Sequence, residues 1–301
     1  MLCSTNIING LIISCAGAFV AFRRKIFIKI TVMTYAQLYE NIKKKGSFLC
    51  VGLDSDPALF PECLKGVENP IFEFNKAIID ATAPYTVAYK PNTAFYEAEG
   101  LEGWKQLEMT VKYISENYPD ILIIADAKRG DIGNTAKRYA KCFFESMPCD
   151  AVTLAPYMGK DSVQPFLDYK GKWSVVLALT SNGSANDFEM LSVGDMPLYE
   201  KVIKTTMTWG SKEDIMFVVG ATRPEKLAEI REYCPDNFFL VPGVGAQGGT
   251  VDEVAKYGLN QHCGLLVNSS RGVIFADKTE NFAKVAGEKA KELADQMAKW
   301  L

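Results

Sequence analysis

The residues of this chain best suited to chemistry are two aspartates and a lysine close together in the sequence, Asp126, Lys128 and Asp131. Four aliphatic residues, 121–124, run directly into this group, and glycines follow it. Such an apolar run predicts a buried parallel strand that ends in a loop. Because side chains two apart on a strand point to the same face, Asp126 and Lys128 should project together. Asp131 follows in the turn, where it can reach back or reach across to another chain.

Burying two carboxylates and an ammonium group at a strand end costs free energy. Such clusters are found most often where the charges have a function, so this one predicts a functional site. The elements that must position it alternate between apolar strand-like runs and segments of helical periodicity. The predicted strands are residues 48–53, 86–90, 121–128, 151–156, 174–179, 215–220, 238–244 and 264–268. The predicted helices are residues 35–45, 71–83, 103–117, 135–146, 198–209, 225–234, 251–257 and 281–301.

Eight strands that alternate with helices are typical of an α/β fold of the (β/α)8 TIM barrel type. An open doubly wound sheet alternates in the same way and is the alternative. No Gly-x-Gly-x-x-Gly motif opens the first strand–helix turn, which argues against a dinucleotide-binding fold. The long interval between residues 180 and 214 is either an active-site lid or a surface insertion.

Bulk composition excludes several classes of protein. The chain has 301 residues, 48% of them hydrophobic, and a net charge of only -3, so no basic field points to a nucleic-acid partner. The eight cysteines are scattered and the single histidine is His262, which argues against a zinc site and against a histidine-based triad. A disulfide scaffold is also not expected at this length. We therefore expect a cytoplasmic protein with reduced thiols.

The first 32 residues differ in character from the rest. Residues 7–22 are largely apolar and are followed by Arg23, Arg24 and Lys25, whereas a secretory signal carries its positive charge before the apolar run. The run is also short for a membrane span. We expect Met33 to be the natural start, residues 1–32 to be a non-native or disordered extension, and residues 33–301 to form one barrel domain with no membrane partner. Two alternatives remain for residues 1–32: a membrane anchor of reversed orientation, or a structural element that packs against the rest of the chain.

In barrels of this type, functional groups collect at the C-terminal ends of the strands. Glycines and Arg271 after the last two predicted strands suit a phosphate site, where backbone N–H groups and a guanidinium hold an oxyanion. Lys90, Asp126, Lys128 and Asp131 lie on the opposite side. A phosphate site on one side and charged residues on the other suit a small phosphorylated metabolite that reacts at the end away from its phosphate. The other candidates read from the strand ends are Asp54, Thr180, Ser181, Gly243, Gly245, Gln247, Ser269 and Ser270.

These motifs closely resemble the orotidine 5′-phosphate decarboxylase family, in its longer bacterial-type subgroup. The resemblance is carried by Asp126-x-Lys128-x-x-Asp131 and by four further segments, residues 49–57, 90–95, 242–249 and 268–271. It covers residues 34 to 300, approximately, and its motifs occur in order. The segment 180–184 departs from the family pattern because it lacks a proline beside its glycine.

The resemblance implies that the chain removes CO2 from orotidine 5′-monophosphate to give UMP, the last step of pyrimidine synthesis, with no metal or organic cofactor. Lys128 would then donate the proton to C6, Asp126 would lie near the scissile carboxylate, and Lys90 would hold Asp126 and the ribose in place. A protonated lysine at C6 is also chemically suitable, because it stabilises developing negative charge and then supplies the proton.

The resemblance further implies a homodimer in which Asp131 and Thr135 reach into the neighbouring subunit's site, and it implies that Ile132 contacts the substrate. Other residues would bind the substrate: the ribose, the pyrimidine ring and the phosphate would be contacted by Asp54, Ser181, Gly245, Gln247, Ser270 and Arg271.

Two other functions remain open at this point. A sister barrel enzyme, a sugar-phosphate decarboxylase or aldolase, carries a similar Asp-x-Lys-x-x-Asp motif and uses Mg²⁺ to stabilise an enediolate. The sequences of residues 129–133 and 90–92 favour the metal-free orotidine 5′-phosphate decarboxylase family over these Mg²⁺-dependent enzymes. A non-catalytic nucleotide-binding barrel is the second alternative. Such a protein should have lost one or more of the charged residues, but Lys90, Asp126, Lys128 and Asp131 are all present.

Overall fold

The computed structural model describes residues 32–244 and 248–301. The sequence predictions for residues 1–31, and for Gly245 and Gln247, therefore lie outside the described residues. In the described part of the chain, no helix is long and apolar enough to cross a membrane.

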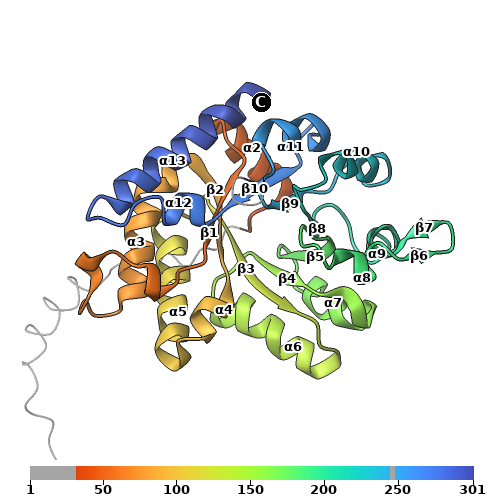
Figure 1. The fold of residues 1–301 in the computed structure, drawn as a ribbon. Coiled ribbons are helices and arrows are strands. Elements are labelled where there is room, and N and C mark those ends of the chain that lie inside the picture. The colour runs from red at the N-terminus through yellow and green to blue at the C-terminus, as the bar shows by residue number, and fades with distance from the viewer. Residues whose placement is uncertain (1–31, 245–247) are drawn as a thin grey trace, which may run out of the picture.

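The strands form a closed parallel barrel in the order β1-β10-β9-β8-β5-β4-β3-β2, which confirms the predicted (β/α)8 architecture (Figure 1). A separate two-stranded hairpin, Ser192–Val193 (β6) and Met196–Pro197 (β7), lies at the periphery of the barrel beside the helix that follows it. The barrel strands are Leu49–Leu53 (β1), Thr86–Pro91 (β2), Leu122–Arg129 (β3), Ala151–Leu154 (β4), Trp173–Leu179 (β5), Ile215–Val219 (β8), Phe239–Pro242 (β9) and Leu265–Ser269 (β10).

Helices surround the barrel, and two of them begin with a capping box. Thr34 begins the first of them with a capping box to Gln37, and Thr250 pairs with Glu253 in the same way before α11. The longer helices are Tyr35–Lys45 (α2), Pro70–Thr82 (α3), Gly100–Asn117 (α5), Gly133–Lys141 (α6), Lys160–Leu167 (α7), Leu198–Thr206 (α9), Pro224–Tyr233 (α10), Val251–Gly258 (α11) and Phe282–Met297 (α13). The short ones are Thr93–Glu97 (α4), Ala185–Phe188 (α8) and Arg271–Ile274 (α12).

The structure differs from the predicted elements in a few places. The predicted helix 135–146 is α6 followed by a π-helical turn, Cys142–Ser146. Helix α7 was not predicted, because it is short and carries Pro165 in its interior. The predicted strand 151–156 ends at Leu154, since Pro156 begins a 3-10 turn. The long interval after residue 180 holds α8, the hairpin and α9.

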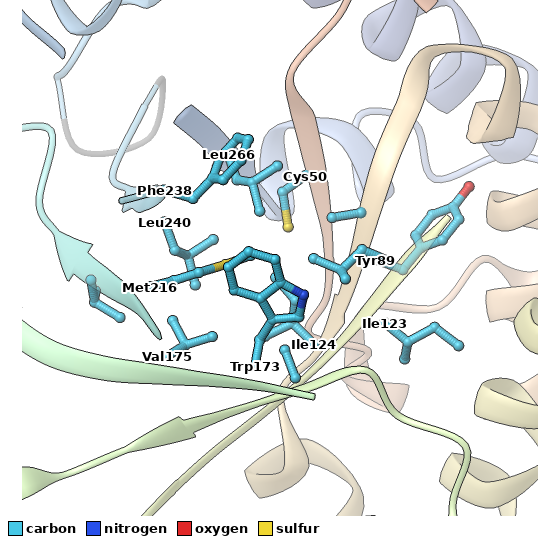
Figure 2. Packing of buried hydrophobic residues seen from close by; sticks show 14 of the residues in the cluster. Cys50, Tyr89, Ile123, Ile124, Trp173, Val175, Met216, Phe238, Leu240 and Leu266 are labelled. Carbon is cyan, nitrogen blue, oxygen red and sulfur yellow. The ribbon is translucent and has the colours of Figure 1, made fainter. Parts of the chain in front are cut away.

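The core fills the inside of the barrel. Figure 2 shows Trp173, Met216 and Leu240, from β5, β8 and β9, packed together between the strands, and all three are buried. At the N-terminal end, the indole of Trp173 donates a 2.8 Å hydrogen bond to the carbonyl oxygen of Met33. Strands buried on both faces explain the nearly continuous apolar runs in the sequence. The packed interior leaves the C-terminal end as the place for a site.

Candidate active site

Two adjoining hollows open at the C-terminal end of the barrel, and both are lined by Lys90, Asp126 and Pro242. The first, which we call the polar hollow, encloses about 190 Å³ and is also lined by Asp54, Asn92, Gly243, Val244, Asn268, Ser270 and Arg271. The second, which we call the walled hollow, encloses about 320 Å³ and is also lined by Lys128, Thr153, Leu177, Thr180, Ser181, Asn182, Val218 and Leu240.

A charge array occupies the boundary between the two hollows. Lys90 Nζ donates to Asp126 Oδ2 at 2.7 Å, and Lys128 Nζ donates to Asp126 Oδ1 at 2.5 Å. The ammonium group of Lys90 also lies 3.8 Å from Asp54 Oδ1. Lys90 and Asp126 are buried, whereas 49% of the Lys128 side chain is exposed toward the opening. The structure thus brings together Asp54, Lys90, Asp126 and Lys128, as the strand-end argument predicted.

The two lysines determine the ionisation of Asp126. Burial would raise the pKa of Asp126, but the charges of Lys90 and Lys128 outweigh it and hold that pKa well below its usual range. Burial would likewise lower the pKa of Lys90, but the carboxylates of Asp126 and Asp54 outweigh it and raise that pKa above its usual value. Asp126 and Lys90 are therefore both charged at neutral pH, and each stabilises the charged form of the other.

The backbone at Lys128 is unusual. Its φ of 45° lies in the left-handed region, which residues other than glycine seldom adopt. The pairing of β3 with β4 shifts register between Ala125 and Arg129, so Lys128 sits within an irregularity of the strand. Asp126 and Lys128 do project together, as their spacing predicted, but the strand is not regular there.

The polar hollow contains a carboxylate oxygen that has no hydrogen-bond donor among the described residues. Asp54 Oδ1 is buried and receives no hydrogen bond from any described residue. Across the hollow, Asn268 donates to the Ser270 hydroxyl at 3.3 Å, and the Cys50 thiol donates to the Asn268 side-chain oxygen at 3.6 Å. A Cβ added at Gly52 would lie 1.9 Å from Ser270 Oγ, so only glycine lets β1 pass this close. Ser270 and the exposed Arg271 lie at the start of α12.

The walled hollow has one apolar wall, and a residue at its rim is held in place by hydrogen bonds. Leu177, Val218 and Leu240 supply its wall from β5, β8 and β9. At the end of β5, the backbone N–H and the hydroxyl of Thr180 donate to the two carboxylate oxygens of Glu189, at 2.7 and 2.8 Å. The neighbouring residue Ser181 lines the hollow, so the first part of the long interval borders the site.

Asp131, Ile132 and Thr135 line neither hollow in the single chain. Ile132 is 44% exposed and Thr135 is exposed as well, while Asp131 accepts a 2.7 Å hydrogen bond from the Ile132 N–H. The structure therefore does not bring these three residues to the charge array of their own chain.

Four polar residues of the hollows were not predicted as site residues: Asn92, Thr153, Asn182 and Asn268. Asn92 and Thr153 follow or end a strand, so the strand-end rule applied to β2 and β4 would have found them. The contact of Asn268 with Cys50 depends on the β1–β10 register, which the sequence does not give. In the described part of the chain, no group of three or more His, Cys, Asp or Glu side chains could hold a metal ion.

The model of the orotidine 5′-phosphate decarboxylase / HUMPS family matches residues 47–285. The chain belongs to this family. It is 59% identical over 268 residues to the orotidine 5′-phosphate decarboxylase of Phocaeicola vulgatus, covering 89% of this chain and 98% of the relative. It is 58% identical over 266 residues to that of Christiangramia forsetii, covering 88% and 98%. The solved OMP decarboxylase of Leishmania donovani has a TM-score of 0.76 and 36% identity, covering 89% of this chain and 99% of its own.

For this member of the orotidine 5′-phosphate decarboxylase / HUMPS family, we predict that Asp126 stays ionised at about pH 4, where an ordinary aspartate is half protonated. Lys128→Met removes one of its two ammonium partners and should raise the pKa of Asp126. Carboxyl ¹³C chemical shifts of aspartate-labelled protein measure this, with Asp126→Asn to assign the signal and the exposed Lys201→Met as control.

The same pKa has a consequence for stability. Because the folded-state pKa lies below that of an unfolded chain, ionised Asp126 stabilises the fold above about pH 4, and the stabilisation is lost as the pH falls further. An Asp126 signal that titrates together with the ordinary aspartates would contradict the proposed electrostatics.

Proposed function

We propose that this chain is a decarboxylase that converts orotidine 5′-monophosphate to UMP and CO2 in pyrimidine biosynthesis. The observation that carries the proposal is the carboxylate of Asp126, held between two ammonium groups where a polar hollow meets an apolar-walled one. Relatives that are 57–59% identical over most of this chain have the name of that enzyme.

The reaction demands a group such as Lys128. When the bond from C6 to the carboxylate breaks, the electron pair stays on C6 in the plane of the ring, with no adjacent carbonyl positioned to delocalise it. An ammonium group beside C6 stabilises that negative charge, donates its proton to the carbon and regains a proton from solvent. Asp126, beside the departing carboxylate, repels it until CO2 leaves, an effect we rank below electrostatic stabilisation.

The two hollows suit the two ends of the nucleotide. In the polar hollow, Ser270 and Arg271 face the phosphate, and Asp54 Oδ1, which receives no hydrogen bond from the described residues, accepts one from a ribose hydroxyl. In the walled hollow, the pyrimidine lies against the apolar wall with Ser181 at its edge and Lys128 at C6. The phosphate roles of Gly245 and Gln247 rest on the family resemblance alone.

The Mg²⁺-dependent alternative needs carboxylates that are free to bind the metal. Both oxygens of Asp126 instead accept hydrogen bonds from ammonium groups, and Asp54 faces Lys90. This donor set favours proton transfer from lysine over metal chemistry. The intact array also argues against a non-catalytic nucleotide-binding barrel. The proposal accordingly includes no metal or organic cofactor, and a cytoplasmic location remains a prediction.

The proposal also includes a homodimer with shared sites. Asp131 and Thr135 lie outside the hollows of their own chain, and Ile132 beside them is exposed. On the loop after β4, which packs against Gly130, Tyr157 and Met158 are 90% and 52% exposed. Large exposed apolar side chains around two otherwise unused polar residues favour a second copy of the chain as the partner.

Wild-type protein should lower the ultraviolet absorbance of orotidine 5′-monophosphate on mixing. Lys128→Ala should reduce turnover by roughly a thousandfold or more, because both the proton donor and the stabilising charge are lost. Binding of UMP, measured by calorimetry, should persist, and Lys201→Ala should behave as wild type. No turnover by the wild-type protein would refute the function, and substantial turnover by Lys128→Ala would refute the proton-donor role.

Mixing two inactive variants tests the shared site. Asp131→Ala and Lys128→Ala subunits should each be nearly inactive, but a mixed dimer would contain one site with both residues intact. Random exchange at equal amounts should recover about a quarter of wild-type activity, since half of the dimers are mixed and each has one intact site. Native mass spectrometry verifies the exchange. If mixed dimers form without recovered activity, the two residues do not act in one shared site.

A further inference from the structure

Thr153, in β4, links the backbone of one charged residue to the side chain of another. Its hydroxyl accepts a 2.9 Å hydrogen bond from the Lys128 backbone N–H and donates a 3.0 Å hydrogen bond to Asp126 Oδ1. The residue is 1% exposed and lines the walled hollow. It is therefore buried against the charge array rather than placed beside it in solvent.

These two hydrogen bonds have only one possible direction. A backbone N–H can only donate, so the Thr153 oxygen must accept from Lys128, and the single hydroxyl proton is left for Asp126. The acceptor, Asp126 Oδ1, is the same oxygen that receives the Lys128 ammonium group. Thr153 thus closes a ring of contacts that runs through the backbone of Lys128, the side chain of Lys128 and the carboxylate of Asp126.

The backbone held by this ring is the irregular one. Lys128 has a left-handed φ of 45°, and the β3–β4 pairing breaks between Ala125 and Arg129. Ladder hydrogen bonds therefore do not fix this stretch as they would in a regular strand, and a conformation of this kind persists only where its surroundings hold it. The Thr153 hydroxyl provides one such contact at Lys128 itself.

We propose that Thr153 is a positioning residue of the active site: its hydroxyl fixes the direction in which Lys128 presents its ammonium group and orients the Asp126 carboxylate between the two lysines. This inference rests on the proposed decarboxylase function. Misplacement of reacting groups by about 1 Å lowers rates by as much as roughly a hundredfold, so loss of this hydroxyl should affect turnover more than binding.

The test compares Thr153→Val with Thr153→Ser. Valine keeps the branched shape in the strand but removes the hydroxyl, and serine keeps the hydroxyl. Thr206→Val is the matched control, because the Thr206 hydroxyl is also buried but has no hydrogen-bond partner among the described residues. For each variant, kcat and KM for orotidine 5′-monophosphate, the affinity for UMP and the urea midpoint of unfolding are measured.

Thr153→Val should lower kcat by roughly tenfold to a hundredfold and leave the affinity for UMP near that of wild type. Thr153→Ser should recover most of the lost kcat, and Thr206→Val should lose none. Three results would overturn the proposal: a kcat for Thr153→Val within about twofold of wild type, no recovery with serine, or a parallel loss of UMP affinity and kcat that tracks the urea midpoint. If wild-type protein shows no turnover, the proposed function fails instead.

Discussion

Asp126 accepts hydrogen bonds from two ammonium groups at once, and the organisation of the site depends on this contact. A carboxylate buried here without partners would be protonated, and a buried lysine without a carboxylate would lose its proton. Together, Lys90 and Asp126 keep each other charged, and Lys128 remains tied to the carboxylate while half of its side chain stays exposed to the hollow. A charged proton donor is thus held at the surface of a mostly buried cluster.

The barrel brings the charged residues together because they lie at the ends of neighbouring strands. Lys90 comes from β2, Asp126 and Lys128 from β3, and Thr153 from β4, which are consecutive strands of the closed sheet. At the opposite end, Arg231 donates 2.7 Å hydrogen bonds to the carbonyl oxygens of Gly258, Asn237 and Gly264, and so joins the segments that precede β9 and β10. At the N-terminal end of the barrel, Arg231 thus binds neutral carbonyl oxygens. At the C-terminal end, the charged groups of the site bind one another.

The fold and most of the charged site could be predicted because they depend on local patterns. Apolar runs that end in charged residues placed Asp54, Lys90, Asp126 and Arg271 at strand ends. The left-handed backbone at Lys128 could not be predicted, because lysine has no preference for it and one of the contacts that hold it comes from Thr153 on another strand. Helix α7 was hidden by Pro165, and the polar chain from Cys50 to Ser270 depends on strand register. The partner-subunit roles proposed for Asp131 and Thr135 would depend on contacts that a single chain does not contain.

In the proposed mechanism, an ammonium group of the protein, rather than a metal ion, stabilises and protonates the reacting carbon. The most direct test is steady-state turnover of orotidine 5′-monophosphate after exhaustive dialysis against EDTA, with and without added Mg²⁺. We predict the same kcat and KM under both conditions, because the ammonium groups already occupy the oxygens of Asp126. Turnover that is lost on chelation and restored by Mg²⁺ would contradict this account.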